Sequence, residues 1–530
     1  MLAALGTTGG ILNVVGALGG VPLVGAAGAI LQEIVQTCDD VKVHKKKSRQ
    51  LSNKCVQVLS ILDEQGSKME GTEIQQIADQ LIPALERIQR RTKAYSNFNS
   101  VITFVKRNDI RDGLSQSISE LETAMSLFHL PDPVCIFPAA LNTHLGLFRA
   151  KIVLHTTQHA ILQTVNSHHA EIQDLLLKIL TEGSERQNVV ELQNTGQRVA
   201  EDIMEVGQKQ LRVLRESRVT EPGSSQFVPT VFDSQRYLQY QRGLIKLHRE
   251  TGIPPTIKIL NGEVTRTSEF AVDGGIYSDI WVGTWLGEEK VALKALRNIK
   301  AADPRAQKRF ENEVKTWAEL KHPHILPFYG IVTNLGQHMH MVSPWQENGN
   351  VLNYVKNHAD ANRLLLIIGA AQGLEYLHSQ NVIHGNIKCA NILVSQQGQS
   401  CICDFGMSKI IEEVTEKSAS ATLTAGGSAR WLAPELIEGS SPTMGADTYS
   451  YAMAVLELLT ERQPYADIKR DAAVIHDIIF LKRTPSRPHR GTTQWLSDAL
   501  WDLMQQCWHQ DSLTWPSMAE VTAALQVMVI

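Results

Sequence analysis

Apolar residues recur every three or four positions through the first 217 residues of the chain. Such positions fall on one side of an α-helix, because a helix has about 3.6 residues per turn. Amphipathic helices are expected at Ile74–Ile88, Ile110–Met125, 154–180 and 189–214, with breaks at Gly66, near Asn108 and at Pro131. The pattern predicts an all-α helical bundle over residues 1–130, followed by brace helices over residues 131–217.

The chain changes character after residue 217. The stretch Glu221–Ser225 consists largely of turn-forming residues, which is typical of a linker. A helix is expected from Phe232 to Thr251, so residues 218–264 are predicted to be a linker and a lead-in helix. Beyond it, Val291–Lys294 has the composition of a strand, and a hairpin turn is expected just before it at Leu286–Glu289.

The first segment of the bundle, Met1–Gln32, contains no charged residue and is rich in Gly, Ala, Val and Leu. It lacks the basic start of a secretory signal. It is long enough to span a bilayer, but its eight glycines and Pro22 weaken helix formation. Three interpretations remain open: a small-residue helix or hairpin packed against the bundle, a segment that inserts into membranes conditionally, and a constitutive span.

A basic run without intervening acidic residues follows this segment. Its members are Lys42, Lys45, Lys46, Lys47, Arg49 and Lys54. The run is either a solvated helical face or a patch for anionic membrane lipid, where each basic residue near the surface contributes roughly 1 kcal/mol. The neighbouring charge-free segment adds weight to the lipid interpretation. On that interpretation the protein is cytoplasmic, with conditional membrane association.

The composition is that of an ordinary globular chain, with 43% apolar and 20% charged residues. The net charge of −4 gives no general attraction for nucleic acid, so no nucleic-acid partner is expected. The seven cysteines are odd in number, scattered and without metal-like spacing, which predicts reduced thiols in the cytoplasm. Cys401 and Cys403 are expected to pack inside a strand.

The most specific motif of the chain lies within Val382–Lys409. Protein kinases carry His-Arg-Asp, then Lys and Asn at fixed spacing, and then Asp-Phe-Gly. The positions in frame here are His384, Lys388, Asn391 and Asp404-Phe405-Gly406. Asn386 replaces the Asp of the first motif, and Gly385 replaces its Arg.

Further matches to the kinase pattern follow in the expected order. Lys294 matches the phosphate-binding Lys, Glu313 its helix partner, Leu432–Glu435 the end of the activation segment, and Asp447 the buried Asp of the central helix. The candidate nucleotide-binding residues are Gly275, Ser278, Ile280, Ala292, Lys294, Glu313, Asn391 and Asp404. Two of these, Asn391 and Asp404, are also the candidate ligands for Mg²⁺.

Asn386 changes the chemistry expected of the catalytic loop, whose second candidate catalytic residue is Lys388. In a kinase the loop Asp orients the substrate hydroxyl and accepts its proton. A neutral amide accepts hydrogen bonds but is not a useful base. Phosphotransfer is therefore expected to be slower by roughly 2–4 orders of magnitude. Gly385 also removes the cation that pairs with a phosphorylated activation segment in many kinases.

Two other positions depart from the kinase pattern. In the glycine loop, Asp273–Ile280, only Gly275 of the three pattern glycines is kept, and Asp273 adds a negative charge near the expected phosphate position. Near the end of the chain, Trp515 stands where kinases have an Arg that pairs with the residue equivalent to Glu435. Glu435 is therefore expected to lack a cationic partner.

On these motifs, residues 265–530 resemble the protein kinases, in particular fungal members of the tyrosine-kinase-like serine/threonine group. The resemblance implies a bilobal α+β kinase-like domain that binds ATP and Mg²⁺. A helical bundle, a brace and an Asp-deficient kinase domain together resemble the mixed-lineage kinase domain-like proteins. That resemblance implies a nucleotide-sensitive pseudokinase that controls a homo-oligomerising, membrane-active bundle in regulated cell death, and no motif identifies the upstream activator.

Two hypotheses of different classes remain. The first is a non-catalytic switch in which a pseudokinase controls the bundle, and Asn386, Gly385 and Asp273 favour it. The second is an active but slow serine/threonine kinase whose bundle docks partners, and the retained Lys294 and Asp404 keep it open. A scaffold that does not bind ATP is disfavoured, because the retained nucleotide and metal residues would then have no role.

Overall fold

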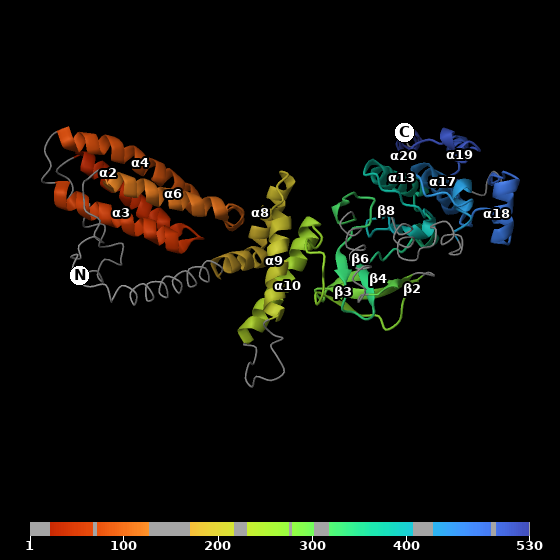
Figure 1. Ribbon diagram of the computed structural model, residues 1–530, viewed down its shortest axis with the longest axis horizontal. Coiled ribbons are helices and arrows are strands. Elements are labelled where there is room, and N and C mark those ends of the chain that lie inside the picture. The colour runs from red at the N-terminus through yellow and green to blue at the C-terminus, as the bar shows by residue number, and fades with distance from the viewer. Residues whose placement is uncertain are drawn as a thin grey trace, which may run out of the picture. The chain divides into compact units, whose positions relative to one another are not determined.

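The computed structural model describes residues 22–66, 72–126, 170–216, 231–274, 278–300, 317–405, 428–488 and 494–528 (Figure 1). The chain divides into two compact units, Met1–Ile253 and Pro254–Ile530. The described residues of the first unit contain helices and no strand, whereas the second unit combines a sheet with a group of helices. This confirms the predicted fold class, an all-helical region followed by a bilobal α+β domain.

The first unit is built from amphipathic helices. They are α2 (Pro22–Asp40), α3 (Lys45–Gly66), α4 (Thr72–Ser96), α5 (Ser100–Val105), α6 (Arg107–Ser126), a helix over 170–181, α8 (Gly183–Asn194), α9 (Val199–Glu216) and α10 (Val231–Thr251). Helices α2 and α6 each pack against α3 and α4. Leu85 and Ile88 of α4 and Ile110 and Leu114 of α6 are fully buried, which confirms the two predicted apolar faces where their side chains are described.

One helix prediction is wrong. The apolar pattern over 189–214 predicted a single helix, but α8 ends at Asn194 and α9 begins at Val199. Gly196 lies between them with φ of 84°, a left-handed conformation that stops a helix and favours glycine. The lead-in helix is confirmed by α10. The predicted helix over 154–180 is described only from residue 170, and the break predicted at Pro131 lies outside the described residues.

Helix α2 contains the last part of the charge-free segment. Ala27 is 4% exposed, and Leu31 and Ile34 are fully buried. Lys93 of α4 pairs with Glu33 at 2.8 Å on the surface beside them. From Ala27 onward the segment is therefore part of the bundle core, while residues 1–21 lie outside the described residues. Among the helices that the structure describes, none is both long and apolar enough to cross a membrane.

The sheet of the second unit is antiparallel. Its order is β1 (Val264–Arg266), β3 (Ser278–Trp285), β4 (Glu289–Lys300), β6 (His338–Pro344) and β5 (Gly330–Val332), and β2 (Asp273–Gly274) also pairs with β3. The turn between β3 and β4 contains Leu286 and Gly287, with φ of 50° and 75°. This turn and β4 confirm the hairpin and the strand predicted over Val291–Lys294.

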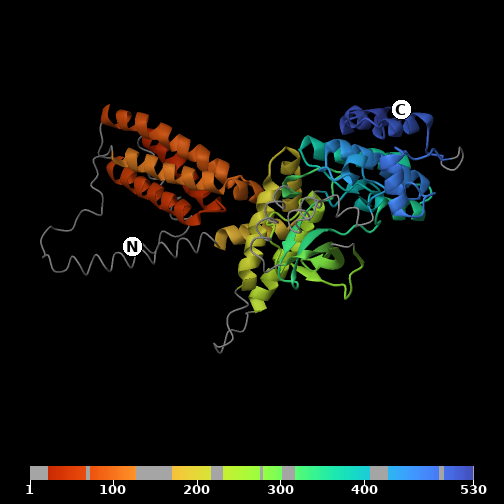
Figure 2. The ribbon, with the colours of Figure 1, turned by 45° about the vertical axis from the view of Figure 1, so that its right-hand side comes forward.

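The other described elements of the second unit are mainly helices. They are α12 (Val351–Asn357), α13 (Arg363–Ser379), η1 (Cys389–Asn391), the paired strands β7 (Ile392–Val394) and β8 (Ser400–Ile402), α16 (Pro434–Ile437), α17 (Met444–Thr460), α18 (Asp471–Phe480), α19 (Asp498–Cys507), η2 (Ser512–Thr514) and α20 (Met518–Val527). Figures 1 and 2 show the green strands at one end of this unit and the blue helices at the other. Helix α17 is buried along almost its whole length, so it forms the core of the helical lobe.

Candidate functional site

Helix α17 fixes the backbone of the loop that carries the candidate catalytic residues. Its Asp447 is 2% exposed and accepts hydrogen bonds from the backbone N–H groups of His384, at 2.7 Å, and Gly385, at 2.8 Å. His378 Nε2 lies 3.0 Å from the same carboxylate. Gly385 has φ of 75°, which glycine adopts without strain. The buried Asp447 expected from the sequence therefore anchors this loop.

Asn386 lies in the middle of the anchored loop and is half-buried. Its backbone N–H donates to His384 Nδ1 at 3.2 Å, and its carbonyl accepts from Asn391 Nδ2 at 2.7 Å. Among the described residues, none forms a hydrogen bond with its side-chain amide. Unlike a carboxylate, this neutral amide cannot serve as a base.

Lys388 connects the loop to the chain that precedes Leu432–Glu435. Its Nζ lies 3.1 Å from Ser428 Oγ and 6.0 Å from the centre of the Trp431 ring. Burial lowers the pKa of Lys388, and the carboxylates of Glu457 and Asp404 oppose that shift. The lysine is thus held in place by a neutral hydroxyl and an aromatic ring.

Glu457 of α17 supports the same loop and was missed in the sequence. It is 7% exposed and accepts hydrogen bonds from Cys389 N–H at 3.0 Å and Trp431 Nε1–H at 2.9 Å. Burial raises the pKa of its carboxyl, and the hydrogen bonds limit the rise. The available signal was a single acidic residue within the apolar run from Ala452 to Leu459.

Lys294 and Asp404 lie together across the two lobes of the second unit. Lys294 Nζ is 2.5 Å from Asp404 Oδ2, and the two side chains are 16% and 29% exposed. Glu313, the predicted partner of Lys294, lies outside the described residues. In the described structure the lysine is therefore neutralised by the Asp of the Asp-Phe-Gly motif.

The residues proposed for Mg²⁺ have suitable chemistry. Asn391 is 7% exposed, and its Nδ2 is committed to the carbonyl of Asn386, so its oxygen is the atom left for a cation. Asp404 adds a carboxylate and has φ of 61°. Amide and carboxylate oxygens are ligands that Mg²⁺ prefers, and these two residues therefore fit the ion.

The strand register brings four of the predicted nucleotide residues onto one face of the sheet. Ile280 pairs with Lys294, which pairs with Met341, and Val282 pairs with Ala292, which pairs with Ser343. Directly paired residues share a face, as do residues two apart on one strand. The predicted members of this face are Ser278, Ile280, Ala292 and Lys294, while Gly275 lies outside the described residues.

In the described part of the glycine loop, the carboxylates of Asp273 and Asp279 accept hydrogen bonds from other groups of the protein. Asp273 Oδ1 accepts a hydrogen bond from Gly274 N–H at 2.7 Å. Asp279 accepts from Arg297 at 2.6 and 3.0 Å, and this pair lowers the pKa of Asp279. Asp273 thus already satisfies one loop amide with negative charge.

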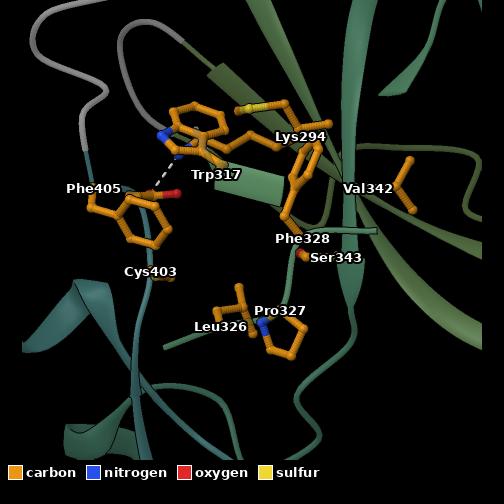
Figure 3. A pocket seen from close by; sticks show the side chains of 11 residues that line it. Lys294, Trp317, Leu326, Pro327, Phe328, Val342, Ser343, Cys403 and Phe405 are labelled. Atoms are coloured by element: carbon orange, nitrogen blue, oxygen red, sulfur yellow. Dashed lines mark ion pairs between the residues drawn. The ribbon is translucent and has the colours of Figure 1, made fainter. Parts of the chain in front are cut away.

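A pocket opens beside the Lys294–Asp404 pair (Figure 3). Its lining is mostly apolar and consists of Lys294, Trp317, Leu326, Pro327, Phe328, Met341, Val342, Ser343, Cys403, Asp404 and Phe405. The Trp317 ring lies 5.9 Å from both Phe405 and Phe328, edge-on in each case. The sequence identified only the two charged members, because the apolar ones come from separate segments. Ile280 and Ala292 are not among the lining residues.

Among the residues that the structure describes, none forms an ion pair with Glu435. Burial raises the pKa of its carboxyl, and neighbouring Glu438 adds to the rise. Trp515 packs against α17 instead, with its ring 5.4 Å from that of Tyr449 and its Nε1–H donating to His509 O at 2.7 Å. Replacing an Arg by Trp at this position therefore exchanges an ion pair for aromatic packing.

Three residues of the basic run in the first unit bind partners within the bundle. Lys42 Nζ donates to Phe98 O at 2.5 Å, Lys47 to Ser115 Oγ, and Lys54 pairs with Glu122 at 2.7 Å. The remaining three, Lys45, Lys46 and Arg49, are exposed. A lipid patch would therefore be centred on these three exposed residues at the start of α3.

Comparison with known proteins matches residues 268–525 to the family of protein tyrosine and serine/threonine kinases. The probable serine/threonine-protein kinase SIS8 of Arabidopsis thaliana is 31% identical over 258 residues, which cover 48% of this chain and 24% of that protein. Serine/threonine-protein kinase STY46 of the same organism is 28% identical over 260 residues, covering 48% of this chain and 43% of that protein.

The probable serine/threonine-protein kinase drkD of Dictyostelium discoideum is 31% identical over 272 residues, covering 49% of this chain and 20% of that protein. The chain thus spans less than half the length of each of these relatives. Its C-terminal half is a protein kinase-like domain homologous to serine/threonine kinases, and a helical region precedes it.

Proposed function

We propose that the kinase-like domain binds Mg-ATP as the ligand of a switch and transfers phosphate very slowly or not at all. In this proposal the domain controls the helical bundle, which oligomerises and acts on membranes in a form of regulated cell death. The observation that carries the switch is Asn386, a residue that is not a base, in frame with His384, Lys388, Asn391 and Asp404.

In this proposal, different residues bind different parts of Mg-ATP. Lys294 would hold the phosphates, with Glu313 orienting it, and Asn391 and Asp404 would hold Mg²⁺. Ser278, Ile280 and Ala292 would face the nucleotide from the sheet, together with Gly275. When bound, Mg-ATP supplies the phosphoryl group and the metal charge that offsets it. Asn386 would orient a substrate hydroxyl and leave its proton in place, so the site favours binding over transfer.

A thermal-shift experiment on the full chain tests nucleotide binding. Mg-ATP at about 100 times its dissociation constant stabilises a protein by roughly 2.7 kcal/mol. We expect such a shift for the wild type and its loss in Lys294→Met. Lys356→Met is the matched control, because Lys356 is an exposed lysine on α12 without an ion pair among the described contacts. If wild type and Lys294→Met melt identically, both with and without Mg-ATP, then ATP is not the ligand of the proposed switch.

A second candidate function is an active but slow serine/threonine kinase whose bundle docks partners. The contact of Lys388 with Ser428 favours it, because this contact would hold the loop lysine beside the end of the activation segment. A phosphotransfer assay separates the two proposals. We expect Asn386→Asp to raise a very low wild-type rate, whereas wild-type turnover near 1 s⁻¹, within the usual range of kinases, would support the second function.

The proposed membrane activity rests on the three exposed cations at the start of α3 and on the charge-free segment before it. We expect the full chain, once released from its resting state, to bind liposomes that contain anionic lipid and to spare neutral ones. Reversing Lys45, Lys46 and Arg49 to Glu should abolish binding. The matched control reverses three exposed lysines of the second unit, Lys356, Lys469 and Lys482. If both variants lose liposome binding equally, binding depends on the net charge of the chain and not on this patch.

Leakage should depend on the segment that precedes the bundle core. Deleting residues 1–21 should leave weak, reversible lipid binding through the basic patch and remove leakage, because stable attachment needs both an apolar segment and a basic patch. Deleting residues 1–32 is not an equivalent test, since it also removes the buried Ala27 and Leu31. If the chain lacking residues 1–21 still releases liposome contents, this segment is not the inserting part.

A further inference from the structure

Helix α8 carries two adjacent residues of opposite charge that contact different neighbours. It packs against α5, which belongs to the bundle, and against α10, whose last residue, Thr251, lies shortly before the second unit begins at Pro254. Glu185 contacts the first neighbour and Arg186 contacts the second. Adjacent residues of a helix point to different sides, so a single turn of α8 joins both contacts.

Glu185 is a buried carboxylate with few donors. It is 8% exposed, and Ser100 of α5, itself fully buried, donates to its Oε1 at 2.5 Å. Its other described partners are more distant, with Asn188 Nδ2 at 3.4 Å and Lys178 Nζ at 3.9 Å. A buried acceptor that loses its short hydrogen bond is strongly destabilised. Ser100 is therefore the closest described partner of Glu185, and it ties this carboxylate to α5.

Arg186 is held in the opposite direction. It is 7% exposed, and its Nε lies 3.0 Å from both carboxylate oxygens of Glu250 on α10. Its Nη1 donates to Leu180 O at 2.9 Å. Removing the partner of a buried charge leaves that charge uncompensated. A loss of the Glu250 contact should therefore displace Arg186 and the turn of α8 that contains it.

We infer that Glu185 and Arg186 make α8 a coupler, through which the position of α10 controls how firmly α5 is held in the bundle. When Glu250 leaves Arg186, α8 shifts and Glu185 loses Ser100. The bundle then opens at α5, which follows α4 and precedes α6 in the chain. This coupling belongs to the first unit and depends neither on nucleotide binding nor on membrane activity.

Hydrogen exchange of the full chain tests the coupling. The amides of Thr103 and Lys106, which donate to Asn99 O at 3.0 Å and Ile102 O at 2.9 Å, report on α5. We expect Ser100→Ala to speed their exchange about tenfold, the size expected for a lost buried hydrogen bond. Glu250→Gln should also speed it severalfold, although no contact between Glu250 and α5 is present among the described residues.

Matched controls are Ser119→Ala, at an exposed serine of α6, and Glu191→Gln, at an exposed glutamate of α8. Both should leave α5 unchanged. Glu250→Asp, which keeps the charge on a shorter side chain, provides a milder variant if Glu250→Gln unfolds the unit. If the Glu250 variants speed exchange in α8 and α10 but leave α5 at the wild-type rate, the coupling does not exist.

The double variant shows whether the two contacts act on α5 through one junction or independently. If α8 couples the contacts, the variant Ser100→Ala with Glu250→Gln should exchange at α5 no faster than the faster single variant, because both changes release the same junction. If the two single effects multiply instead, they are independent, and the coupler is refuted.

Discussion

Replacing Leu31 by Ala tests whether α2 is a permanent part of the bundle core. Leu31 is fully buried, and Ala27 and Ile34 are buried near it on the same helix. Truncation to Ala removes three carbon atoms, which at roughly 0.8 kcal/mol each cost about 2.4 kcal/mol of transfer free energy. The cavity left behind adds to this, and Leu→Ala changes in well-packed cores cost about 2–5 kcal/mol in total.

Calorimetry of the full chain measures this cost for each unit separately. Two units with separate cores should give two transitions, and the transition of the second unit is the one that Mg-ATP is expected to raise. For a unit of this size each kcal/mol shifts the melting temperature by roughly 2–4 °C. We therefore expect Leu31→Ala to lower the first unit's transition by about 5–15 °C and to leave the other unchanged.

The control is Ala29→Ser, because Ala29 lies on the same helix but is exposed. Its effect should stay near 0.5 kcal/mol, the size of a helix-propensity change. A Leu31→Ala chain that melts like the wild type would show that α2 does not contribute to the core. In that case the whole charge-free segment, Met1–Gln32, would again be available for insertion.

Three further predictions concern stability and can be read from urea unfolding of the full chain. Burial raises the pKa of Glu435 above its usual 4.5, so between pH 4.5 and the raised pKa the native state holds a proton that the unfolded state has lost. Glu435→Gln should therefore gain stability relative to the wild type as the pH rises through that window. A pH-independent difference would contradict this. Gly243→Ala should destabilise by about 1–3 kcal/mol, since its added Cβ would lie 2.6 Å from Leu180 Cβ. Arg430→Met should lower the free energy of unfolding by about 3–5 kcal/mol, because it leaves three backbone carbonyls and Asp471, at 2.7 Å, without their donor. A loss below 1 kcal/mol would show that this buried cation is not structural.

Local sequence was sufficient to predict the features that depend on residues close together in the chain. The spacing of Lys388 and Asn391 from Asn386 identified the candidate catalytic loop, because residues so close in sequence stay together within one short loop. The same holds for the turn at Leu286–Gly287, where chain reversal needs conformations that few residues adopt. Three- and four-residue periodicity likewise predicted α4 and α6, since burial of one face dominates the stability of such helices.

Contacts between distant segments could not be read in this way. Glu457 and Ser428 were missed because their roles come from partners far away in sequence, at Cys389 and Lys388. The basic run looked uniform, yet Lys42 and Lys54 are bound within the bundle whereas Lys45 is exposed.

The sequence by itself determined the order of the elements, the kinase-like half and the missing base at Asn386. Only the tertiary structure decided which charges are neutralised, where the charge-free segment enters the core, and that α8 joins Ser100 to Glu250. The physical reason is that a side chain's identity fixes what it can bond, while its burial and its partners depend on segments that fold against it from elsewhere in the chain. Glu185 shows this plainly, because its sequence neighbourhood is that of an ordinary exposed helix, and only α5 makes it a buried carboxylate.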